Sequence, residues 1–126
     1  MNIPEELRYT EEHEWARKDG DTVVIGISDY AQGELGDVVF LDLPTVGDKF
    51  SQNDVFGTIE AVKAAADLYI PLTGEVIEVN DSVVDAPETL NKDPYGDGWM
   101  IKIKIASDEE YNNLMDASSY KAHIGQ

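Results

Sequence analysis

Apolar and polar residues alternate along several short runs of the chain, which is the pattern of strands that bury one face. These runs occupy residues 22–27, 37–43, 55–59, 75–79 and 99–105. Clusters rich in Gly, Pro and Asp lie between them, as turns would. Many short strands joined by such turns are typical of a β-sandwich or a small barrel.

The alternation also predicts which side chains share a face of each strand. In the first run, one face carries Val23, Ile25 and Ile27. In the second run, one face carries Val39, Leu41 and Leu43, and the other carries Val38, Phe40 and Asp42. In the last run, one face carries Trp99, Ile101, Ile103 and Ile105, and the other carries Met100, Lys102 and Lys104.

Helical signals are short and lie outside these runs. Ser28 and Asp29 can cap a turn through residues 31–35 that Gly36 ends. The acidic start at residues 107–110 predicts a second helix, and residues 116–124 predict a C-terminal one. We therefore expect one mainly β unit with short peripheral helices.

One short pattern occurs twice. Residues 43–48 and 70–75 both read apolar-Pro-x-x-Gly-acid, with an offset of 27 residues. Two related halves could close a small barrel with quasi-two-fold symmetry, and two convergent turns would give the same pattern.

Composition narrows the classes of function. The chain holds 26 Asp and Glu against 9 Lys and Arg, a formal charge of −17. Nucleic acids and anionic membranes would be repelled, so we expect neither as a partner. The absence of cysteine excludes disulfides and thiolate catalysis. No signal peptide or membrane span is evident, and we expect a cytoplasmic protein.

Lys63 is the one basic residue between Lys49 and Lys92, a stretch that holds eight acids. Alanines at positions 61 and 64–66 surround it, which suits a lysine that another enzyme acylates. The neighbouring carboxylates favour the charged ammonium and disfavour a Schiff-base role. Residues 60–67 are mostly good helix formers, yet strand-like runs flank them, so a short helix and a hairpin tip both fit.

The residues around Lys63 also resemble a known motif. Residues 60–69, EAVKAAADLY, followed by Pro71 and by Gly-Glu-Val at 74–76, are similar to the lipoyl-attachment motif of the glycine cleavage H-protein family. Further matches follow the family's order at residues 13–15, 24–27, 31–32, 35–40, 43–44, 47, 91, 94–96 and 98–99. Together they cover nearly the whole chain.

The resemblance implies a barrel-sandwich hybrid, a lipoyl-carrier domain spanning residues 1–126, with Lys63 displayed on a hairpin and carrying lipoate. Family members are non-catalytic carriers. The arm takes an aminomethyl group from the P protein (glycine decarboxylase) to the T protein (aminomethyltransferase). It then delivers electrons to the L protein (dihydrolipoyl dehydrogenase). A lipoate ligase or a lipoyl/octanoyl transferase would attach the group, and we expect the carrier to be a monomer.

The resemblance also places Glu14 and Asp67 at a cleft that shields the loaded arm, where their carboxylates would contact the amine. Two positions depart from the family's usual residues. Ala61 stands where serine is frequent, and Glu12 stands where a neutral polar residue is common. The first bears on recognition by the attaching enzyme, and the second bears on the charge of the cleft.

Other readings of the sequence stay open. A lipoyl domain of a 2-oxo acid dehydrogenase would lack the regions around residues 13–15 and 94–96. A biotin carrier would have Met on both sides of the lysine, where this chain has Val62 and Ala64. A protein that stores or relays lipoyl groups to other proteins fits the residues equally well. His13 and His123 are far apart in sequence, and we expect no metal site.

Overall fold

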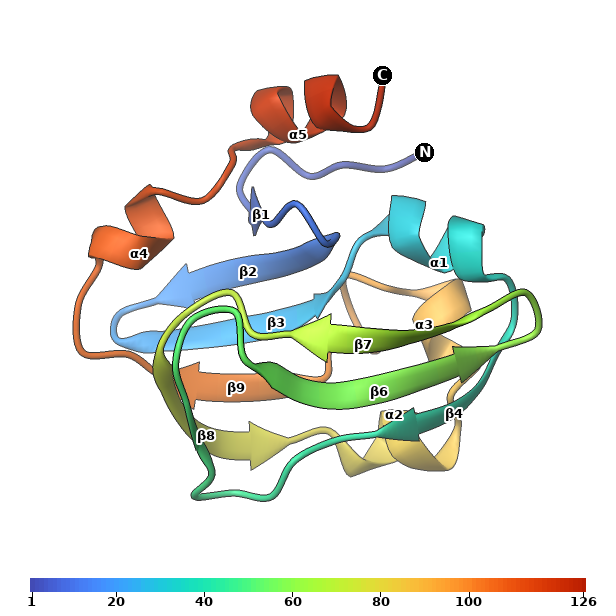
Figure 1. The fold of residues 1–126 in the computed structure, drawn as a ribbon, viewed down its shortest axis with the longest axis horizontal. Coiled ribbons are helices and arrows are strands. Elements are labelled where there is room, and N and C mark those ends of the chain that lie inside the picture. Colours follow the sequence, from blue (N-terminus) through green and yellow to red (C-terminus); the bar gives the residue numbers. More distant parts are fainter.

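The computed structural model describes all 126 residues. Two antiparallel sheets form stacked layers, and short helices lie at their ends (Figure 1). The strands are β1 (Arg8–Tyr9), β2 (Glu14–Asp19), β3 (Thr22–Ile27), β4 (Val38–Asp42), β5 (Lys49–Phe50), β6 (Val55–Ala61), β7 (Ala65–Tyr69), β8 (Gly74–Val79) and β9 (Ile101–Lys104). The helices are α1 (Asp29–Leu35), α2 (Asp81–Asp85), α3 (Thr89–Lys92), α4 (Glu109–Asn112) and α5 (Ala117–His123).

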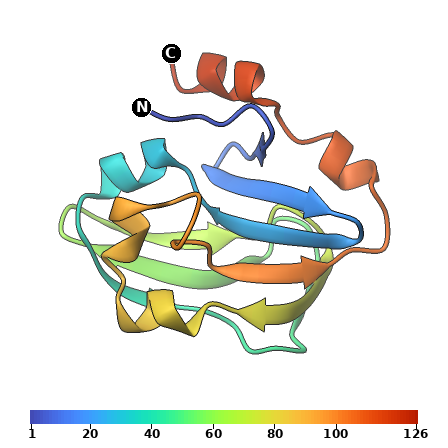
Figure 2. The same cartoon turned by 180° about the vertical axis from the view of Figure 1, so that it is seen from behind.

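The larger sheet has the strand order β1-β2-β3-β9-β8-β5, and the smaller sheet has the order β4-β6-β7. Figure 1 looks onto β6 and β7, with β3 and β9 behind them, and Figure 2 shows the opposite side. Neither sheet closes on itself. The arrangement confirms the expected mainly β barrel-sandwich hybrid with short peripheral helices.

The space between the sheets holds the main core, a cluster of 19 buried residues. Val23, Ile25 and Ile27 belong to it, as the alternation of β3 predicts. Val24 points the other way, into a second cluster of seven residues that includes Tyr9, Trp15 and Tyr120. The larger sheet is therefore buried on both faces around β3, because the two ends of the chain cover its outer side.

The alternation fails in β4. Val38 and Leu41 are both buried, whereas Val39 and Phe40 are both exposed. The ladder between β4 and β6 shifts register between Val38 and Phe40, as a β-bulge does. The extra residue in the bulge turns two successive side chains to solvent, so the prediction that Val38 and Phe40 share a face was wrong.

Met100 is a second departure from strict alternation. It lies fully buried in the main core, together with Ile101 and Ile103. Met100 precedes β9, and its backbone donates to the carbonyl of Ile25 (2.8 Å) and accepts from the amide of Asn80 (2.9 Å). The alternation along this segment therefore begins only at Ile101.

Capping residues define where the predicted helices α1 and α5 begin, and Gly36 defines where α1 ends. Ser28 Oγ accepts from the amide of Ala31 (3.2 Å), and Gly36 ends α1 at φ 76°. Asp116 caps α5 by accepting from the amide of Ser119 (2.8 Å). Helices α2 and α3 were not predicted, because they have four or five residues and no side-chain cap.

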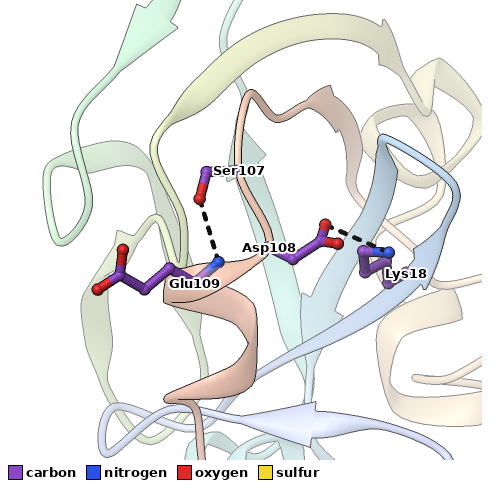
Figure 3. Close-up of polar contacts among 4 residues, drawn as sticks. All are labelled: Lys18, Ser107, Asp108 and Glu109. Atoms are coloured by element: carbon purple, nitrogen blue, oxygen red, sulfur yellow. Dashed lines mark hydrogen bonds and ion pairs between the residues drawn. The ribbon is translucent and has the colours of Figure 1, made fainter.

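Ser107 and Asp108 fix the start of α4 (Figure 3). The Ser107 hydroxyl accepts from the amide of Glu109 (3.2 Å), and Asp108 pairs with Lys18 of β2 (3.3 Å). An exposed ion pair of this kind contributes about 0–1 kcal/mol. The acidic helix start is therefore confirmed, and it also ties α4 to β2.

The two copies of the repeated pattern meet in space. Strand β5 follows the first copy and pairs with β8, where Lys49 lies opposite Glu75 and Phe50 lies opposite Gly74. The amide of Gly47 donates to Val76, and the amide of Val76 donates to Asp48, both at 2.8 Å. Antiparallel pairing of equivalent segments is the arrangement that two related halves would produce.

Candidate functional site

Lys63 lies on the turn between β6 and β7. Ile59 pairs with Ala66 and Glu60 pairs with Ala65, and the amide of Ala61 donates to the carbonyl of Ala64 (2.9 Å) to close the turn. Residues 60–67 thus form a hairpin tip despite their helix propensity. Pairing with β4 and packing on the core outweigh a helix preference of a few tenths of a kcal/mol per residue.

The end of α1 and the residues that follow it hold this turn by hydrogen bonds. The amide of Val62 donates to Asp37 (2.9 Å), and the amide of Lys63 donates to Leu35 (3.1 Å). A side chain at Gly36 would meet Cγ of Lys63 at 3.1 Å, so the lysine stem lies directly over this glycine. Glycine is also required there by the positive φ of 76°.

The Lys63 ammonium group lies near the end of α1. Its Nζ donates to the carbonyl of Gly33 at 3.4 Å, and the side chain is otherwise exposed. The backbone of the turn is therefore fixed by several hydrogen bonds, whereas the tip of the side chain is held by one long contact.

Asn91 of α3 joins the segment after α1 to the rest of the fold. Its Oδ1 accepts from the amide of Val38 (2.9 Å), and its Nδ2 donates to the carbonyl of Gly36 (2.8 Å) and to Gln32 (3.1 Å). Both N–H donors of the amide and one of the two acceptor positions of its oxygen are thus used within the segment that supports the hairpin.

A cleft of about 170 Å³ lies beside the hairpin. Leu35 lines it and also accepts the Lys63 amide, so the cleft begins where the lysine is held. The other apolar lining residues are Ile27, Ala31, Ile59, Ala66 and Leu68. The polar lining residues are Glu12, His13, Glu14, Glu34 and Asp67.

Glu14 is the buried acid of this cleft. Its side chain accepts from the Thr10 hydroxyl (2.6 Å) and from the amide of Tyr69 (3.5 Å). Burial raises the pKa of Glu14 to about 8, and the charge of Glu12 adds to this effect. The carboxyl group is therefore mostly protonated at neutral pH. Glu14 also lines a second cavity of about 530 Å³, whose other lining residues include Thr10, Tyr69 and Met115.

His13 connects the cleft to the C-terminal helix. It adopts a left-handed backbone (φ 76°), and its Nδ1 lies 2.9 Å from the hydroxyl of Tyr120. The Tyr120 hydroxyl shares a second hydrogen bond with Ser28, the cap of α1 (2.7 Å). Burial and the nearby His123 lower the pKa of His13. Helix α5 thus reaches both the cleft and the start of α1.

Comparison with known proteins identifies the family. A model of the family described as glycine cleavage H-protein matches residues 7–126. The chain belongs to the glycine cleavage H-protein family.

Similar proteins agree with this assignment over the full length. The chain is 53% identical to a glycine cleavage system H protein of Anaeromyxobacter sp. (strain K) over 98% of this chain and 97% of the relative. It is 46% identical to that of Staphylococcus carnosus over all of both chains. A crystal structure of a glycine cleavage system H protein from Mycobacterium marinum has a TM-score of 0.87 at 36% identity, covering 98% of this chain and 100% of that one.

The structure brings two of the three predicted site residues into one cleft. Glu14 lies inside it, and Asp67 lies at its exposed rim without a hydrogen bond or ion pair. Lys63 lies just outside, on the adjoining turn. Glu12, which departs from the family's usual residue, lines the cleft and raises the pKa of Glu14. Ala61, the other departure, lies in the ladder opposite Val38.

Sequence reasoning missed several residues that shape the site. The sequence presents Gly36 as a helix stop and as part of the resemblance, and Asn91 only as part of the resemblance; neither pattern indicates support of the lysine turn. Glu14 accepts one hydrogen bond from Thr10, four residues before it, and one from the amide of Tyr69, which lies 55 residues away along the chain. A buried polar group needs partners, so the burial of Glu14, once known, would have led to them.

No group of three or more His, Asp or Glu side chains is placed to hold a metal ion. Every helix is too short or too polar to cross a bilayer.

Proposed function

We propose that the protein is the lipoyl-bearing carrier of the glycine cleavage system, with lipoate joined as an amide to Nζ of Lys63. The carrier would take the aminomethyl group from the P protein to the T protein and electrons to the L protein. Residues 1–126 would act as one carrier unit, and the chemistry on the arm would belong to the partner enzymes. The observation that carries this proposal is an exposed lysine held on a braced hairpin beside a cleft.

The residues present fit a lipoyl group. Lys63 is exposed at a turn whose backbone is fixed by hydrogen bonds to Leu35 and Asp37. The aliphatic stem of Lys63 lies so close over Gly36 that a side chain at position 36 would crowd it. When attached, a lipoyl group supplies a dithiolane that accepts the aminomethyl group and carries electrons as the dithiol. The lysine stem gives this group reach, while the braced turn fixes its point of departure.

We further propose that Glu14 and Asp67 bind the amine of the loaded arm. Glu14 is mostly protonated at neutral pH because it is buried without a cation. An ammonium group that entered the cleft would lower the pKa of Glu14 and draw its proton off to solvent, which leaves an ion pair. Asp67 would add a second carboxylate at the rim, and the apolar lining would exclude water from the arm.

Intact-mass measurement tests the attachment site. The wild-type protein and Lys63→Ala would be produced in cells supplied with lipoate. We expect a lipoyl-sized increment on the wild type and none on the variant. Wild-type protein that stays unmodified beside a known lipoyl protein modified in the same cells would overturn the proposal.

Reconstitution with the P protein tests the carrier role separately. Lipoylated protein, P protein and labelled glycine are combined, and transfer of the aminomethyl group is measured on the protein. We expect transfer. Lipoylated protein that accepts no aminomethyl group, while it still donates lipoyl groups to other proteins, would instead establish the relay function.

A further inference from the structure

The bulge in β4 leaves two large apolar side chains side by side in solvent. Val39 is 61% exposed and Phe40 is 50% exposed, and Val62 on the lysine turn is 72% exposed. We call these three residues the apolar patch. Single exposed apolar residues are ordinary, whereas a contiguous group of them marks an interaction site more often.

The ladder places this patch next to Lys63. Residues that pair across an antiparallel sheet lie on the same face, so Phe40, Glu60 and Ala65 form one outward row. Lys63 follows Glu60 by three residues, and the amide of Val62 donates to Asp37 just before β4. Neighbouring strands are about 4.8 Å apart, so the patch lies within one or two strand spacings of the turn. Figure 1 shows no helix in front of β6 and β7.

Acids border the patch. Asp37 precedes β4, Asp42 is its last residue, and Glu60 lies opposite Phe40; all three are exposed. Residues 19–48 contain no Lys or Arg, and residues 50–91 contain only Lys63. The complementary surface is therefore apolar at its centre and basic at its edge.

We propose that the apolar patch is the docking surface for the enzyme that acylates Lys63, which presents an apolar face bordered by Lys and Arg. This inference rests on the proposed function. The enzyme must bring Nζ itself into its active site, so it must contact whatever lies within a few ångströms of the turn. Partners that act on the attached lipoyl group can bind farther from the turn, because the lipoyl-lysine arm spans the distance.

The step that follows docking is an acyl transfer. Nζ of Lys63, after loss of a proton to a base of the enzyme, attacks the carbonyl carbon of a lipoyl adenylate. The C–N amide bond forms, the bond from that carbon to the phosphate oxygen breaks, and AMP leaves with the electron pair. The remaining extra proton on nitrogen goes to solvent, and nothing is oxidised or reduced.

The test measures acylation of the unmodified full-length protein by a lipoate ligase supplied with lipoate and ATP. Phe40→Ser and Val39→Ser should each lower kcat/KM about tenfold, mainly through KM, as loss of an apolar anchor does. Phe40→Leu should restore most of the rate. The matched control is Val46→Ser, since Val46 is 59% exposed but lies on the turn after β4, away from the lysine. Its rate should match that of the wild type.

Melting temperatures within a few degrees of the wild type would show that the variants are folded. Equal acylation rates for Phe40→Ser, Val46→Ser and the wild type would overturn the inference and leave the carrier function intact. Failure of the wild type itself to be acylated would overturn the carrier function. A Phe40→Ser variant that changes only P-protein loading, or only self-association in sedimentation, would also overturn the inference.

Discussion

Lys63, on the turn beside the cleft, and Glu14, inside the cleft, lie in opposite environments. Lys63 has an exposed side chain and a backbone held by the carbonyl of Leu35. Glu14 is 1% exposed, with its carboxyl group held by Thr10 and Tyr69. In one residue the main chain is fixed and the side chain is free, and in the other the side chain is fixed and desolvated. In the proposed carrier role, the first arrangement suits delivery to several partners, and the second suits protection of a labile group.

Moving the lysine by one residue should have the largest effect. In Lys63→Ala/Ala64→Lys the amine stays exposed and charged, but it leaves the position supported by Leu35 and Gly36. We expect acylation to fall on the order of 100-fold, because small displacements of a reacting group cost that much. Initial rates with a lipoate ligase check this, with Ala64→Lys alone as the control, since it keeps Lys63. Equal rates for the moved and the original lysine would mean that exposure alone suffices.

Removing the buried acid should change how stability depends on pH. The folded-state pKa of Glu14 is about 8, against an ordinary value of 4.5. A raised pKa gives stability that is present below pH 4.5 and is lost as pH rises toward 8. Between pH 4.5 and 8, ionisation of Glu14 should lower the free energy of unfolding of the wild type by up to about 5 kcal/mol. Glu14→Gln has no group to ionise at this position and should not show this loss.

Denaturant unfolding at several pH values measures this effect. The free energy of unfolding of Glu14→Gln minus that of the wild type should grow from pH 4.5 to 8, and the other acids cancel in the difference. The control is Glu11→Gln, an exposed acid whose charge does not contribute to the raised pKa of Glu14. A difference that stays flat across this window would contradict the raised pKa.

Releasing the support of the hairpin should have a smaller effect. Asn91→Ala leaves the amide of Val38 and the carbonyl of Gly36 without their side-chain partner. We expect a loss of about 2–3 kcal/mol in unfolding free energy. Hydrogen exchange should also become faster at the amides of Val62 and Lys63.

The matched control for this change is Asn112→Ala. Asn112 is exposed on α4 and its side chain makes no hydrogen bond, so the free energy should stay within about 0.5 kcal/mol. Unchanged exchange at Val62 and Lys63 in Asn91→Ala would show that the turn is held by its own ladder alone.

Salt should have the smallest effect, a severalfold change in association with the P protein. The charge of −17 is screened beyond about 10 Å at 0.1 M salt, so stopped-flow association rates should fall as ionic strength rises. Glu60→Gln, beside the lysine turn, should reduce this dependence more than Asp19→Asn at the far end of β2. Association rates that do not change with salt would show that electrostatic steering plays no part in binding to the P protein.

The sequence predicts the regular parts of this fold well. Strand β3 has the bounds that its alternation indicates, and the Ser28 cap and Gly36 stop of α1 are both present. The failures come from tertiary context. The bulge in β4 cannot be read from Val38–Val39–Phe40, since three apolar residues fit either register. Strand β2 was missed because charged residues at its end hide the buried ones at its start.

In the candidate site, too, local sequence patterns predict some features, and others depend on tertiary contacts. Lys63 is prominent in the sequence because it is isolated among acids and small residues. The choice between a helix and a hairpin at residues 60–67 needed the pairing of β6 with β7, because local propensity favours the helix. The environment of Glu14 depends on Tyr69 of β7, which lies far away in sequence. Residues that act through long-range contacts, such as Asn91, therefore stay hidden from local patterns.

The pairing of the two chain ends has a consequence for synthesis. Tyr9 exchanges two backbone hydrogen bonds with Met115, and its ring stacks on Tyr120 at 4.5 Å. The ribosome releases residue 120 last of these, seconds after residue 9 has emerged. A nascent or prematurely ended chain therefore exposes Tyr9 and the aromatic surface around it. Chaperones and proteases act on such exposed surfaces, so the packing of α5 on Tyr9 also shields this part of the chain from them.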